Sequence, residues 1–228
     1  MAEQATELKF VAASGSENVS AILLRPETAT HLLILGHGAS TNMLHATLQS
    51  IAESLSEVGV ATFRYNFPYT EYGRVRDSQQ VCTATVRSAV AAAREYAPEL
   101  PLMAGGHSFG GRMTSTAASQ MPLEGVTGLV LFSFPLHLPG RPDVKRAEHL
   151  SAVTVPMLFL SGTRDAFADL ALLRPVCQRL GKLATLHLID TADHGYRIQK
   201  RARKSGEDVF VEMARAVRDW AGKPEWRT

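Results

Sequence analysis

Six residues near the middle of the chain constrain its fold most: Gly106-His107-Ser108-Phe109-Gly110-Gly111. They follow a short apolar run, residues 100–105, which is typical of a buried strand, and precede residues 113–121, which can form a helix. A serine at a strand-to-helix turn has its hydroxyl pushed out of the sheet edge, and the flanking glycines give the tight turn its space. The segment therefore predicts a nucleophile elbow with Ser108 at its tip.

Strand-like and helix-like segments alternate along the rest of the chain. Short runs rich in Val, Leu and Ile predict strands at residues 8–13, 19–25, 32–35, 60–65, 129–134, 155–160 and 185–189, the last three buried. Helical periodicity or alanine-rich composition predicts helices at residues 44–58, 76–96, 113–121, 168–180 and 207–220. Residues 14–18 are expected to turn between the first two strands. The pattern predicts a single α/β domain over residues 1–228, with a mostly parallel twisted sheet of about seven to eight strands and helices on both faces.

A short connection bears on access to any site in this sheet. Only about twenty residues separate the strand that ends near Phe134 from the strand that starts near Val155. That length is too small for a separate cap domain. We therefore expect an open site, covered only by short loops.

Composition narrows the partners and the compartment. The net charge of +2 predicts no general attraction to nucleic acid or to a membrane surface. No secretory signal or membrane-spanning stretch is found in the sequence, and Cys82 and Cys177 fit free thiols or buried small residues, so a cytoplasmic location is expected. The basic run at residues 197–204 is interpreted as a solvated face rather than a nucleic-acid patch. We expect a monomer or a small homo-oligomer.

An elbow serine needs a base, and the base needs a group that orients it. His194 follows the last predicted strand and is the candidate base. Asp165 follows the strand at residues 155–160 and is the candidate orienting acid. Sites in open parallel sheets form at such strand ends, and Ser, Asp, His is the chain order expected for this elbow. Activity should fall on the acid side as His194 becomes protonated.

Three other acids compete with Asp165 for the orienting role. They are Asp169, Asp190 and Asp193, and each could instead cap a helix or a turn.

Acyl transfer also needs backbone N–H donors for the oxyanion. The N–H of Phe109, directly after the nucleophile, is the first candidate. The second is the N–H of Ala39, in the loop that follows the strand at residues 32–35.

Several residues near predicted strand ends are candidates for substrate contact. They are His37, Tyr65 and His137. The favoured role of His37 is to hold the oxyanion loop, Tyr65 could instead belong to an aromatic packing cluster, and His137 could equally be a hydrogen-bonded loop residue. His107 is expected to pack into the fold. The eight histidines have no metal-ligand spacing, so no metal is expected.

These motifs together resemble the alpha/beta hydrolases over nearly the whole chain. The chain is most similar to a small lidless branch described as dienelactone-hydrolase-like or as predicted hydrolases. The matching stretches are His37-Gly38-Ala39-Ser40, Gly106 to Arg112, Pro135 to Pro142, Gly162-Thr163-Arg164-Asp165 and Asp193-His194. The resemblance implies an alpha/beta-hydrolase fold without a cap domain, and ester or thioester hydrolysis without a cofactor.

One departure from that branch concerns the nucleophile. True dienelactone hydrolases carry a cysteine where this chain has Ser108, which argues against a dienelactone as the substrate. The leading hypothesis is a serine hydrolase of small carboxylic esters or thioesters that forms an acyl-enzyme. The alternative is a catalytically idle alpha/beta-hydrolase fold that serves as a binding or scaffold module, because the branch also resembles proteins that act in larger assemblies.

Overall fold

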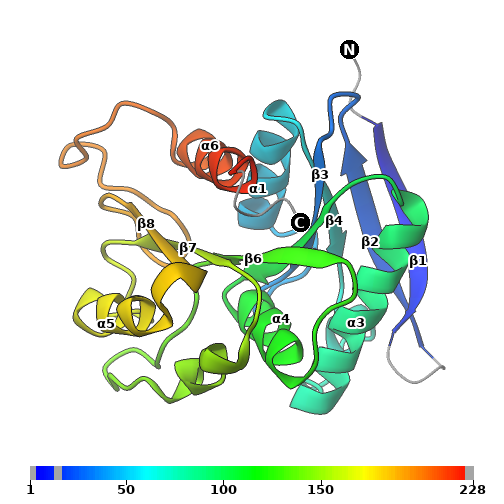
Figure 1. Ribbon diagram of the computed structural model, residues 1–228, viewed down its shortest axis with the longest axis horizontal. Helices are drawn as coiled ribbons and strands as arrows, with labels where there is room; N and C mark the ends of the chain where they lie inside the picture. The colour runs from blue at the N-terminus through cyan, green and yellow to red at the C-terminus, as the bar shows by residue number, and fades with distance from the viewer. Residues whose placement is uncertain (1–3, 13–16, 224–228) are drawn as a thin grey trace.

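A sheet of eight strands forms the centre of the computed structural model, which describes residues 4–12 and 17–223 (Figure 1). The strands are β1 (Gln4–Ala12), β2 (Glu17–Arg25), β3 (His31–Gly36), β4 (Val60–Tyr65), β5 (Leu102–His107), β6 (Val126–Phe132), β7 (Met157–Gly162) and β8 (Ala184–Ile189). Their order in the sheet is β1-β2-β4-β3-β5-β6-β7-β8. β2 pairs antiparallel with β1 and β4, and all other neighbours are parallel. The predicted mostly parallel sheet is confirmed.

Helices cover both faces of the sheet, as predicted. The α-helices are α1 (Ala46–Glu57), α2 (Pro68–Glu71), α3 (Gln79–Tyr96), α4 (Phe109–Gln120), α5 (Leu170–Leu180) and α6 (Val209–Ala221), and the 3-10 helices are η1 (Lys145–Ala152) and η2 (Gly181–Leu183). Figure 1 shows α1 and α6 together on one face and α3, α4 and α5 on the other. None of the helices in the described part of the chain is long and apolar enough to cross a membrane.

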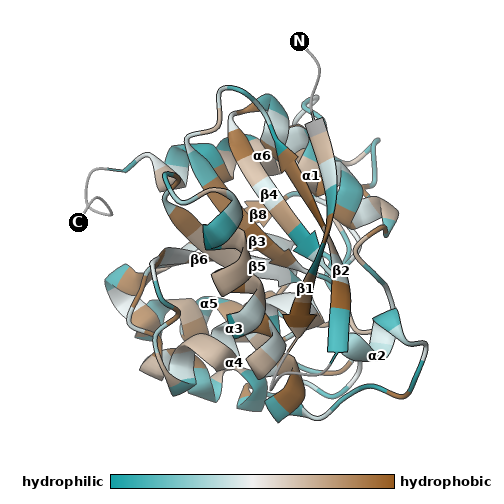
Figure 2. Cartoon of the chain, turned by 90° about the vertical axis from the view of Figure 1, so that its right-hand side faces the viewer, coloured by the Kyte–Doolittle hydropathy of each residue, from teal (hydrophilic) through white to brown (hydrophobic). Residues whose placement is uncertain are grey.

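The core has two layers because alternate residues of each strand point to opposite faces. On β3, Leu33 and Leu35 join the apolar cluster that includes α1 and α6, whereas Leu32 and Ile34 join the cluster that includes α3 and α4. Figure 2 shows hydrophobic residues along the sheet and hydrophilic residues on the outer sides of the helices. The side chains of residues 32–35 on β3 are all buried. Burial on both faces of the sheet explains why β3 has a continuous apolar sequence rather than an alternating one.

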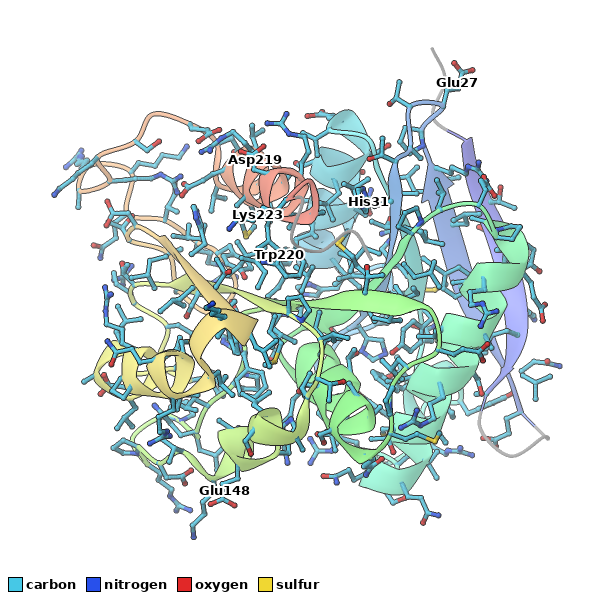
Figure 3. All side chains as sticks on the ribbon, viewed as in Figure 1. Glu27, His31, Glu148, Asp219, Trp220 and Lys223 are labelled. Carbon is cyan, nitrogen blue, oxygen red and sulfur yellow. The ribbon has the colours of Figure 1, made fainter. Side chains whose placement is uncertain are left out.

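Trp220 of α6 illustrates how closely the helices approach the sheet. Its ring lies over β6 (Figure 3), and a Cβ added to Gly128 would come within 2.6 Å of it. Only glycine at this position leaves room for the indole, and the indole in turn is buried.

The starts of α3, α5 and α6 differ by two or three residues from the predicted ones because polar caps define them, whereas α4 begins at Phe109, four residues before the predicted start at residue 113. Ser78, Asp169 and Asp208 precede α3, α5 and α6, and each side chain accepts a hydrogen bond from a backbone N–H of the first turn. The helices therefore begin after these caps rather than at residues 76, 168 and 207.

Three expectations about local structure are changed. The strand at residues 185–189 was expected to be buried, but β8 lies at the sheet edge and only Ile189 is buried. The short α2 and η1 were not predicted, because one or two helical turns carry little periodicity. The turn expected at residues 14–18 falls largely on residues 13–16, which lie outside the described residues.

The connection between β6 and β7 contains one short helix, η1, and no cap domain, as the sequence predicted. The carboxyl ends of β3, β5, β7 and β8 lie on the same side of the parallel part of the sheet. The loops that follow them carry the candidate functional residues, because this edge is where side chains from several parallel strands can meet.

Candidate active site

Ser108 lies directly between β5 and α4 with a backbone φ of 52° and ψ of −112°. Residues other than glycine rarely adopt a positive φ, so the backbone at Ser108 is strained. A Cβ on Gly106 would come within 2.5 Å of the Gly36 carbonyl oxygen, and one on Gly110 within 2.2 Å of the same oxygen. The glycines on both sides therefore let β3 approach the turn, which gives the elbow its predicted geometry.

Ser108, His194 and Asp165 form one hydrogen-bonded chain. The Oγ of Ser108 lies 2.8 Å from Nε2 of His194, and Nδ1 of His194 lies 2.9 Å from each carboxylate oxygen of Asp165. The Asp165 side chain has no exposed surface, whereas that of His194 is 21% exposed. A carboxylate can only accept, so Nδ1 carries the proton and Nε2 is left to accept from the serine hydroxyl.

Two neighbouring loops bring His194 and Asp165 together. The N–H of Arg164, after β7, donates to the Ala192 carbonyl, after β8, over 2.9 Å. A Cβ on Gly162 would come within 2.3 Å of that same carbonyl oxygen. The two loops are thus in direct contact, and residues 29 positions apart in the chain become hydrogen-bond partners.

The competing acids have other roles in the structure. Asp169 caps α5, and Asp193 accepts hydrogen bonds from the N–H groups of Gly195 and Arg197. Asp190 accepts from the N–H of Lys204. Of the four candidate acids, Asp165 alone is paired with His194.

Phe167 and His107 were not predicted as site residues, but both contact His194, and Phe167 also contacts Asp165. The ring centroid of Phe167 lies 4.2 Å from that of His194, and the Phe167 N–H donates to Oδ1 of Asp165 over 2.8 Å. Nε2 of His107 donates to the His194 carbonyl over 2.9 Å. His107 could have been suspected from its place in the elbow, but nothing in the sequence around Phe167 indicates its contact with His194.

The loop after β3 carries the second candidate oxyanion donor, Ala39. The Tyr69 hydroxyl donates to the Ala39 carbonyl over 3.1 Å, and the Thr41 N–H donates to the Gly38 carbonyl over 3.2 Å. Neither the Ala39 N–H nor the Phe109 N–H has a hydrogen-bond acceptor among the described residues. Both donors are therefore available for an incoming oxygen.

The three residues expected to contact substrate are buried instead. His37 accepts from the Phe67 N–H at Nε2 and donates from Nδ1 to the Gly38 carbonyl, and Tyr65 is enclosed by Phe10 and Phe67. His137 donates from Nδ1 to the Leu138 carbonyl and accepts from the Asp169 N–H at Nε2.

Their exposed fractions are 0% for His37 and Tyr65 and 4% for His137. Both ring nitrogens of each histidine are already bonded and Tyr65 has no exposed surface, which argues against substrate contact for His37 and Tyr65. His137 lines a hollow that it shares with Asp165, so its contact with substrate stays a prediction.

Burial sets the charge of the other groups around the site. It lowers the pKa of His37 and of His107 to about 4, so both rings are neutral at neutral pH. It raises the pKa of the Cys82 thiol to about 12 and that of Cys177 to about 11. Both thiols are free and buried, so neither competes with Ser108 as a nucleophile.

A metal would need several ligating side chains close together. In the described part of the chain no group of three or more His, Cys, Asp or Glu residues could hold one.

Comparison with known proteins agrees with the architecture. Residues 29–222 match the model of a family described as an alpha/beta hydrolase domain. Three solved structures are similar over nearly their whole length. They are a dienelactone hydrolase from Anabaena variabilis (TM-score 0.74, 19% identity, 96% of this chain and 97% of that chain), an α/β serine hydrolase without a lid from Xanthomonas campestris (0.72, 18%, 97% and 95%), and Est1E from Butyrivibrio proteoclasticus with ferulic acid bound (0.67, 18%, 93% and 97%). The predicted lidless fold is confirmed.

Proposed function

Because the chain belongs to the alpha/beta hydrolase domain family, we propose that it is a serine hydrolase that cleaves small carboxylic esters or thioesters. The observation that carries this proposal is the unbroken chain of hydrogen bonds from Ser108 through His194 to Asp165 at the tip of a strained elbow. Strain at a serine is costly, and its coincidence with a base in hydrogen-bond contact supports a nucleophile rather than a packing residue.

The first half-reaction would form an acyl-enzyme. As the Ser108 Oγ attacks the ester carbonyl, Nε2 of His194 takes its proton. The N–H groups of Phe109 and Ala39 would hold the oxyanion, and neither has another acceptor within residues 4–12 and 17–223. The collapse of the tetrahedral intermediate expels the alcohol or thiol, which receives the proton from His194.

The second half-reaction would release the acid. Nε2 of His194 takes a proton from a water molecule as the water oxygen attacks the carbonyl of the acyl-enzyme. His194 then returns a proton to the Ser108 oxygen as the acid leaves. Asp165 keeps the His194 ring in the productive tautomer throughout and stabilises its charged form. The complete burial of the Asp165 carboxylate keeps water from competing for this hydrogen bond.

Labelling with a fluorophosphonate tests the proposal directly. The wild type should be labelled at neutral pH and Ser108→Ala should not, because the probe reacts with an activated serine. Ser151→Ala is the matched control, since Ser151 is exposed on η1 and its hydroxyl donates to the Glu148 carbonyl of the same helix. Absence of label in the wild type would remove the enzyme proposal and favour a binding or scaffold module.

A further inference from the structure

Three arginines come from separate segments that meet near the elbow. The Arg76 guanidinium lies 5.3 Å from the centre of the Phe109 ring. Arg112 is one helical turn beyond Ser108, and its N–H donates to the Ser108 carbonyl over 3.1 Å. Arg146 lies on η1, which packs on α4, and donates to the His137 carbonyl. The three side chains therefore start from α4, the helix of the elbow, or from segments that contact it.

Arg112 is the centre of this group. Burial lowers its pKa, and the positive charges of Arg146 and Arg76 lower it further. Its guanidinium makes no hydrogen bond or ion pair with any described residue. A half-buried guanidinium beside two like charges is unfavourable in the free protein, and an anion would relieve that repulsion.

In the part of the chain that the structure describes, these three arginines differ from several others in their ion pairing. Arg74, Arg94, Arg203 and Arg215, which lie elsewhere, are each paired with Asp or Glu. No ion pair of this kind involves Arg76, Arg112 or Arg146 among the described residues.

The acidic residues nearest to these arginines in the sequence make contacts elsewhere. Asp77 pairs with Arg74 and accepts from the Tyr69 N–H. Glu148 is exposed and points away from the sheet (Figure 3), toward a hollow that it shares with Arg179.

From these contacts we infer that Arg76, Arg112 and Arg146 bind an anionic group, a carboxylate or a phosphate, that is carried by the ester substrate. Arginine presents several N–H donors in one plane and binds either anion through two parallel hydrogen bonds. One helical turn of about 5.4 Å separates Arg112 from Ser108, so the anion would stand only a few bonds from the scissile carbonyl. The inference rests on the proposed function, because it names the substrate class of that site.

Pairs of esters that differ only in charge test the inference. Monoethyl succinate is compared with ethyl 4-methylpentanoate, in which an isopropyl group replaces the carboxylate. Acetylglycerol phosphate is compared with acetylglycerol, and this second pair distinguishes phosphate from carboxylate. The wild type should turn over the charged member of at least one pair with a kcat/KM roughly tenfold higher, which corresponds to about 1.4 kcal/mol.

Arginine variants test which residues are responsible. Arg112→Gln and Arg76→Gln should each lower the charged-to-neutral ratio of kcat/KM severalfold or more, mainly through KM. Arg174→Gln is the matched control, because Arg174 is an exposed arginine on α5, and it should keep the ratio. A wild-type ratio near one, or a ratio that neither Arg112→Gln nor Arg76→Gln changes, would overturn the inference.

Binding separates failure of this inference from failure of the proposed function. If no ester is hydrolysed and Ser108 is not labelled, the hydrolase proposal fails. Calorimetric titration with succinate and with inorganic phosphate then decides about the anion site. Binding that Arg112→Gln abolishes supports it, and absence of binding in the wild type refutes it.

Discussion

The Nε2–H of His107 donates a hydrogen bond to the backbone carbonyl of His194 over 2.9 Å. The residue before the proposed nucleophile thus holds the loop that carries the proposed base. His107 is buried and neutral, and its ring also faces that of His194 at a centroid distance of 5.4 Å. The loop that carries His194 is thereby tied to the residue next to Ser108 in the chain.

Substitution of His107 tests this link. His107→Leu removes the donor and should lower kcat by about tenfold or more with little change in KM, because His194 loses the bond that orients its loop. His107→Gln can donate from a similar position and should recover most of the loss. Steady-state kinetics and the rate of fluorophosphonate labelling measure both variants. Equal loss in both would mean that the ring's packing matters rather than its hydrogen bond.

The close contact between the elbow and β3 predicts a stability effect. Gly110→Ala places a Cβ within 2.2 Å of the Gly36 carbonyl oxygen, so the backbone must shift. We expect the free energy of unfolding to fall by about 1–3 kcal/mol or more, as measured by urea denaturation. Gly206→Ala is the control, because a Cβ there meets nothing within 4 Å, and it should change stability by less than about 0.5 kcal/mol. Equal effects would contradict the described packing.

Two buried histidines predict how stability depends on pH. In the folded protein the pKa of His37 and of His107 is about 4, against 6.5 for an unperturbed histidine. Between these pH values the unfolded chain binds more protons than the folded one, so stability falls as the pH falls from about 6.5 towards 4.

The expected slope is up to about 1.4 kcal/mol per pH unit for each histidine. Urea denaturation at pH 7 and pH 5 measures it. His107→Gln removes one of these groups and should make the slope shallower, while His149, whose pKa burial also lowers to about 4, still contributes. An unchanged slope would show that other groups govern the acid range.

The short connection between β6 and β7 predicts the acyl-chain preference. Its only helix is η1, and no cap domain encloses the site, so little apolar surface is available to bind a long chain. A series of p-nitrophenyl esters should show kcat/KM highest for short acyl chains and declining as the chain lengthens. Better turnover of long chains would argue against an open site.

Much of the fold could be predicted because it depends on local patterns. Apolar strands bounded by turn residues and helices with apolar spacing were found near their true positions, whereas α2 and η1 were missed because they are too short to show a period. The basic run at residues 197–204 is exposed at most positions, as expected, but Arg203 is buried and pairs with Glu212 of α6. That pairing depends on where the loop contacts α6, which cannot be predicted from neighbouring residues in the sequence.

The sequence by itself determined the alternation of strands and helices, the elbow at Ser108 and the order in which Ser108, Asp165 and His194 occur. Each of these features depends on residues that are close together in the sequence, through the periodicity of apolar side chains and the absence of a side chain at glycine. The tertiary structure alone decided that Asp165 rather than Asp169, Asp190 or Asp193 meets His194, and that His37, Tyr65 and His137 are buried. It also decided that the segments carrying Arg76, Arg112 and Arg146 meet near the elbow. These outcomes depend on distances between segments far apart in the chain, which are set by how the loops pack at one edge of the sheet.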